Sequence, residues 1–180
     1  AHRHPRLRLF TCRHQRNPFG PWIHCRLVVQ ESQNQHSRMT NEQLSQHFSL
    51  AEFTRSDTAK RRGIDNTPSL SVVVLLSGLC HNVLEPLRKF AGQPIIIGSG
   101  YRSPALNKAV GGVSNLQHMT GEAADIHIPD EATGKRWFVW LMDNVPFHQL
   151  IWEKSTPSST HHWIHVAFKR TGISLTSLTS

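Results

Sequence analysis

Cysteine is scarce in this chain of 180 residues. The three cysteines, Cys12, Cys25 and Cys80, are too few and too scattered for a disulfide scaffold or for a zinc site made of thiolates. Long hydrophobic runs are missing as well. The richest run, residues 70–80, is interrupted by two serines and a glycine, whereas a membrane span needs ~18–20 consecutive apolar residues. We therefore expect a fold without covalent cross-links and without a membrane partner.

Internal repeats are also absent, and the composition is that of a folded chain. Hydrophobic residues make up 38% and charged residues 18% of the sequence, which argues against wholesale disorder. The length suits one domain that can bury a core of its own.

Positive charge is concentrated in the first 38 residues. The chain has 20 lysines and arginines against 12 acidic residues, a formal charge of +8. Residues 1–38 hold seven arginines, no lysine and a single acid, Glu31, so they carry +6 of this total. The remaining 142 residues are close to neutral, and the high isoelectric point therefore describes the leader rather than the domain.

Three interpretations of residues 1–38 stay open. An arginine-rich arm can bind nucleic acid, but no nucleic-acid-binding motif accompanies it. A secretory signal needs an apolar run of about 7–15 residues before its cleavage site, and this segment has none. We favour a leader that is disordered or non-native, because "MTNEQLSQHFSLAEF" from Met39 reads like a natural start. A domain over 39–170 and a flexible, Ser/Thr-rich tail over 171–180 would follow.

From Met39 on, helical and extended patterns alternate. Ser49 and Glu52 form a capping-box pattern within 47–57. Apolar residues at three- and four-residue steps predict the longest helix over 69–91, with Pro86 near its end. The other elements that we expect are helices over 103–112 and 131–144 and strands over 94–102, 123–128, 148–153 and 163–168. This order predicts an α+β domain with antiparallel pairing near its C-terminal end.

A candidate metal site begins with His118 and Asp125. We expect the histidine in a glycine-bearing loop and the aspartate on a strand with apolar neighbours. Because an unpaired buried carboxylate is costly, Asp125 needs a partner such as a divalent cation. His165 is the third candidate ligand, since it alternates with apolar residues on the last strand and shares a face with Trp163. Two imidazoles and one carboxylate leave a fourth zinc position open, the pattern of catalytic zinc sites.

Two further residues suit hydrolysis at such a site. Glu153, at the end of "QLIWE", is the best candidate for a general base that takes a proton from water. Arg102, in "SGYRS", can bind a substrate carboxylate or neutralise an oxyanion, and Tyr101 beside it adds a hydrogen-bonding ring. His127 shares the strand of Asp125 and is a minor alternative ligand.

The motifs "SGYRSPALNKAVGG", "SNLQHMTGEAADI", "QLIWE" and "WIHVAF" resemble the M15 family of zinc peptidases, in particular its subfamily A. The resemblance covers about residues 46–168. It implies Zn²⁺ on His118, Asp125 and His165 and a compact domain like those of the D-Ala-D-Ala peptidases and the hedgehog signalling protein, with a small antiparallel sheet and flanking helices.

The resemblance also implies substrate contacts at five positions, which are Arg102, Tyr101, Gln117, Ser114 and Trp163. Two departures from the family pattern stand out. Ser114 lies farther from His118 than the matching serine of many relatives does. Some members place the catalytic acid three residues before the last ligand, where this chain has His162. His162 is therefore the alternative base to Glu153.

We expect a monomeric zinc peptidase that cleaves peptidoglycan stem peptides, as a carboxypeptidase or an endopeptidase, with no nucleic-acid partner. The alternative is a binding module on the same scaffold that keeps zinc without turnover. Because no signal peptide is recognised, we expect cytoplasmic synthesis and delivery to the periplasm or cell wall, as for a phage endolysin, or a place in the virion.

Overall fold

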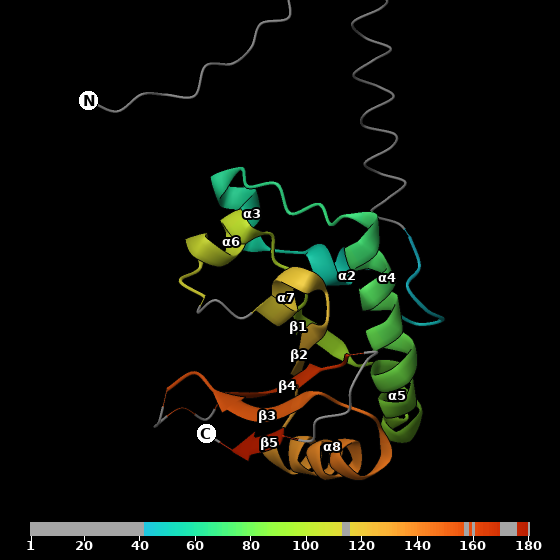
Figure 1. Cartoon of the computed structure of the whole chain (residues 1–180). Coiled ribbons are helices and arrows are strands. Elements are labelled where there is room, and N and C mark those ends of the chain that lie inside the picture. Colours follow the sequence, from blue (N-terminus) through green and yellow to red (C-terminus); the bar gives the residue numbers. More distant parts are fainter. Residues whose placement is uncertain (1–41, 113–115, 157–158, 160, 170–175, 180) are drawn as a thin grey trace, which may run out of the picture. The chain divides into compact units, whose positions relative to one another are not determined.

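The structure, a computed structural model, describes residues 42–112, 116–156, 159, 161–169 and 176–179. The predicted leader, residues 1–38, lies outside the described residues. The domain has the predicted α+β architecture, with helices on both sides of one sheet (Figure 1). Its helices are α2 (Leu50–Thr54), α3 (Asp57–Arg62), α4 (Leu70–Leu79), η1 (Cys80–Leu84), α5 (Glu85–Ala91), α6 (Pro104–Ala109), α7 (Leu116–Thr120) and α8 (Glu131–Asn144). Its strands are β1 (Ile96–Ser99), β2 (Ala123–His127), β3 (Gln149–Lys154), β4 (His162–Ala167) and β5 (Thr176–Thr179).

The sheet has the strand order β1-β2-β4-β3-β5. The first four strands pair antiparallel, as the sequence predicts, and β5 pairs with β3 in parallel. The segment 171–180, for which we expect a flexible tail, thus contains a paired strand at 176–179. Residues 171–175 and 180 lie outside the described part of the chain.

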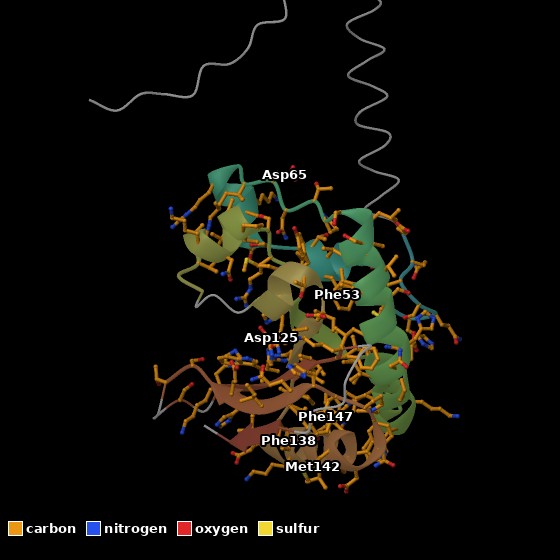
Figure 2. All side chains as sticks on the ribbon, in the orientation of Figure 1. Phe53, Asp65, Asp125, Phe138, Met142 and Phe147 are labelled. Atoms are coloured by element: carbon orange, nitrogen blue, oxygen red, sulfur yellow. The ribbon has the colours of Figure 1, made fainter. Side chains whose placement is uncertain are left out.

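Alternation along the strands gives the sheet two unlike faces. Residues such as Ile126 and Ile164 point to one face, where α8 packs on β3 and β4 and contributes the buried Trp137. Asp125 and His165 point to the other face, beside α7. Figure 2 shows Asp125 on the α7 side of the sheet and Phe138 on the α8 side. The polar face is therefore the place for a site.

One continuous helical segment, residues 70–91, covers the core. α4, η1 and α5 follow each other without a break, and the N–H of Glu85 bonds to the carbonyl of Cys80, five residues back. This π turn lies immediately before Pro86, which has no N–H to continue the regular ladder. By length and composition this helix could cross a membrane. In the domain, part of its apolar surface is buried in the core, with Leu76 and Leu87 fully buried, while Leu70 and Val74 are exposed.

One local expectation is confirmed, and two need correction. The capping-box pattern within 47–57 is present at the start of α2, where the carboxylate of Glu52 accepts hydrogen bonds from the N–H and hydroxyl of Ser49. Arg55 is extended and separates α2 from a second helix, α3. His118 lies in α7 rather than in a loop, and residues 116–120 form a helical turn too short to leave a periodic pattern in the sequence. The strand expected over 163–168 begins one residue earlier, so His162 is the first residue of β4.

Candidate metal centre

Three side chains converge on the polar face of the sheet, from α7, β2 and β4. His118 Nε2 lies 3.3 Å from Asp125 Oδ1, and His165 Nδ1 lies 2.9 Å from the same oxygen. One ligand atom from each residue lies within 4.8 Å of the other two. The arrangement follows from the register, since Asp125 and His165 are directly opposite each other on β2 and β4. The predicted trio is thus assembled.

The outer nitrogen of each imidazole faces an oxygen that can only accept. His118 Nδ1 donates to the carbonyl of Gly100 at 2.7 Å, and His165 Nε2 donates to Gln117 Oε1 at 3.2 Å. A neutral imidazole carries a single N–H, so these two bonds favour the tautomers with the proton on the outer nitrogen. In these tautomers the lone pairs of His118 Nε2 and His165 Nδ1 point inward, as in metal sites whose outer contacts orient the ligands.

The carboxylate of Asp125 divides its two oxygens between different partners. Oδ1 faces the imidazoles, and Oδ2 accepts a hydrogen bond from Arg102 Nη2 at 3.2 Å. Burial raises the pKa of Asp125, but the hydrogen bonds and positive charge of His118 and His165 outweigh burial and hold the pKa well below its usual range. Asp125 is therefore an anion at neutral pH.

Two imidazole nitrogens and one anionic oxygen converge here and need positive charge between them, supplied either by protons on the inward nitrogens, as in the hydrogen bonds to Asp125, or by a metal cation. Both imidazoles are almost fully buried, with His118 3% and His165 1% exposed, so water contributes little to balancing the charge of Asp125. Nitrogen and carboxylate donors in this number match zinc better than calcium or magnesium, which prefer oxygen ligands. The residues present therefore fit the zinc ion that the sequence predicts.

The other predicted site residues fall into two groups. Glu153 lies opposite Trp163 in the β3–β4 ladder, and both share the sheet face of His165. His162 points to the other face, where its ring packs against Trp152 at a centroid distance of 5.4 Å. The geometry thus brings Glu153 to the trio's side of the sheet and turns His162 away from it.

Arg102 lies beside the trio and is held there by Ser99, whose hydroxyl accepts from Arg102 Nε at 3.0 Å and from Nη2 at 2.9 Å. Tyr101 is buried between the core and a neighbouring pocket. Burial is the main cause that raises the pKa of its hydroxyl. Ser114 lies outside the described residues, so its predicted substrate contact stays a prediction.

A pocket of about 330 Å³ opens beside Asp125, and we call it the Trp163 pocket. It is lined by Gly98, Ser99, Asp125, His127, Ser155, His161 and Trp163. The indole N–H of Trp163 is buried and, within the described part of the chain, has no hydrogen-bond partner. His127, the minor alternative ligand, lines this pocket and is not one of the three converging residues.

Sequence reasoning missed the groups that hold the ligands in place. Gln117 Oε1 accepts the hydrogen bond of His165, and the expected substrate contact of Gln117 stays a prediction. Ser99 anchors Arg102, and the carbonyl of Gly100 anchors His118. In the sequence, only the run Gly98-Ser99-Gly100 indicated that the backbone here is special. The structure shows the reason at Gly100, where a Cβ would lie 2.7 Å from the backbone of Phe53.

The family model of Peptidase M15 matches residues 46–167, which is more than half of the chain. The chain belongs to the peptidase M15 family. The match runs from the segment before α2 to the end of β4 and includes all three converging residues. M15 peptidases are metallopeptidases, in agreement with a metal centre at His118, Asp125 and His165. No individual curated protein shows a significant match to the chain.

The close approach of Gly100 to Phe53 gives a testable prediction for the M15 domain. Gly100→Ala should lower the free energy of unfolding by about 1–3 kcal/mol, because the added methyl group must displace backbone. Zinc affinity should fall as well, since the Gly100 carbonyl orients His118. Thermal unfolding and zinc titration measure the two effects.

Gly98→Ala is the matched control, because its Cβ would meet only the Asp125 carbonyl, at an ordinary 3.5 Å. An equal loss of stability in both variants would show that the contact with Phe53 is not what requires glycine at position 100.

Proposed function

We propose that this M15 domain is a zinc-dependent peptidase of subfamily A that hydrolyses peptide bonds in peptidoglycan peptides. The convergence of His118 Nε2, Asp125 Oδ1 and His165 Nδ1 beside an open pocket is the observation that carries the proposal. Three protein ligands leave a coordination position for a water molecule or substrate, as catalytic zinc sites require.

His118, Asp125 and His165 would hold the zinc ion. When bound, zinc supplies a Lewis acid that acidifies water and polarises a peptide carbonyl. The chain's own part is to prepare the ligands. The carbonyl of Gly100 and Gln117 Oε1 favour the tautomers whose inward nitrogens can bind the metal, and Arg102 occupies the second oxygen of Asp125, which leaves Oδ1 as the ligand atom.

Glu153 is the general base in this proposal. It lies one strand from His165 and two residues along, a diagonal neighbour within reach of a long side chain. Its carboxylate takes a proton from the attacking water and returns it to the amine that leaves when the peptide C–N bond breaks. Arg102, which still has Nη1 outside the bonds to Ser99 and Asp125, supplies positive charge to the carbonyl oxygen or to a substrate carboxylate.

Metal removal tests this function. The full chain, treated with a chelator and dialysed, should lose cleavage of purified peptidoglycan and recover it when zinc is added, with fragments identified by mass spectrometry. Their masses also show whether the enzyme removes terminal residues or cuts within the peptide. Zinc-loaded protein that binds muropeptides but releases no product would overturn the proposal and favour the binding module.

A further inference from the structure

A second and larger pocket lies next to the metal centre, and we call it the Arg55 pocket. It measures about 610 Å³, within the ~300–1,000 Å³ range of ligand sites. Gly98 and Ser99 line both this pocket and the Trp163 pocket. The two pockets therefore meet at the end of β1, where Ser99 anchors Arg102.

Two arginines, Arg55 and Arg102, line the Arg55 pocket. Arg102 is already bound to Ser99 and Asp125. In the described part of the chain, the side chain of Arg55 has no hydrogen-bond or ion-pair partner. Asp57 lines the same pocket, but no ion pair joins it to either arginine among the described residues. Arg55 thus offers a positive charge that the protein itself does not use.

The backbone presents Arg55 to this pocket. Arg55 is the extended residue between α2 and α3. Asn66 ties the wall that carries Arg55 to the wall that carries Arg102: its Nδ2 donates to the carbonyls of Thr54 and Tyr101, and its Oδ1 accepts from the N–H of Ser103. The backbone at both arginines is therefore held in place, so that a ligand bound between them orders mainly the exposed side chain of Arg55.

We propose that the Arg55 pocket is a subsite for a carboxylate group of the substrate, so that the enzyme selects acidic peptides through Arg55. The inference rests on the proposed peptidase function, because it takes the ligand to be the peptide that reaches the metal centre past Ser99. A guanidinium suits this role, since it binds carboxylates through paired, charge-assisted hydrogen bonds.

Three synthetic stem peptides test the subsite. One has its glutamate and C-terminal carboxylates free, one is amidated at the glutamate and one at the C-terminus. With zinc-loaded wild type, amidation of the carboxylate that binds Arg55 should raise KM about tenfold over the free peptide.

Arg55→Gln should raise KM for the free peptide by the same factor and leave kcat unchanged. It should also abolish the difference in KM between the free peptide and the amidated peptides. Arg55→Lys should keep part of the preference for the peptide with free carboxylates. Asp57→Asn should lower KM for the free peptide about threefold, because it removes a like charge.

Arg61→Gln, an exposed arginine of α3 that does not line the pocket, is the matched control and should change nothing. The subsite is refuted if wild type treats all three peptides alike, or if Arg55→Gln raises KM equally for all of them. Calorimetry with the zinc-free chain, which cannot turn over, measures binding of the same peptides separately. Preference in binding without any cleavage by zinc-loaded protein would refute the peptidase function and retain the subsite.

Discussion

Glu153→Gln is expected to lower kcat about 10²–10⁴-fold and to leave zinc affinity unchanged. Glutamine keeps the size of the side chain but cannot accept the proton of the attacking water. Glu153 is not one of the three converging ligands, and it lies opposite Trp163, one strand away from His165. Initial rates on a stem peptide and a zinc titration of the same preparation separate the loss of the base from the loss of the metal.

His162→Gln is the control for Glu153→Gln. His162 has the sequence position of the catalytic acid in some relatives, but its ring packs on Trp152 at the opposite face of the sheet. Its replacement should change kcat less than threefold. A large loss in His162→Gln together with normal turnover in Glu153→Gln would reverse the assignment of the base.

Two members of the trio were predictable because they lie where local patterns are strong. Asp125 and His165 alternate with apolar residues on strands, and a period of two determines which side chains share a face. The same alternation separates His165 from Ile164, which is completely buried on the α8 side. The long helical segment 70–91, the helix α8 and the four antiparallel strands were predictable for the same reason.

The surroundings of the ligands were not predictable, because they depend on contacts between distant parts of the chain. Gln117 and His165 are separated by 48 positions, and His118 and Gly100 by 18. No periodicity encodes such contacts. The helix α7 was missed because five residues are too few for a helical pattern. The break at Arg55 was missed although the next residue, Ser56, is a typical N-cap and accepts a hydrogen bond from the N–H of Ala59 at the start of α3. Arg55 lines its pocket from this extended position, so the pocket was not predictable either.

Gln117→Leu is expected to lower zinc affinity about 10–100-fold, the usual effect of removing an outer hydrogen bond from a metal ligand. Without Gln117 Oε1, the N–H of His165 loses its acceptor at 3.2 Å, and the tautomer with its proton on the inward Nδ1 becomes accessible. That tautomer cannot ligate through Nδ1. Competition with a chromophoric chelator measures the dissociation constant directly.

Thermal stability gives a second measurement of the same affinity. Zinc at 100 times the wild-type dissociation constant should stabilise wild type by about 2.7 kcal/mol, and a 100-fold weaker variant by only about 0.4 kcal/mol. Gln117→Glu should retain most of the affinity, because a carboxylate oxygen still accepts the N–H of His165. Gln149→Leu, on β3, removes an amide that bonds to none of the three ligands in the described residues, and should behave like wild type. If Gln117→Leu binds zinc as tightly as Gln149→Leu, then Gln117 does not position His165, and the predicted substrate contact becomes the better interpretation of its amide.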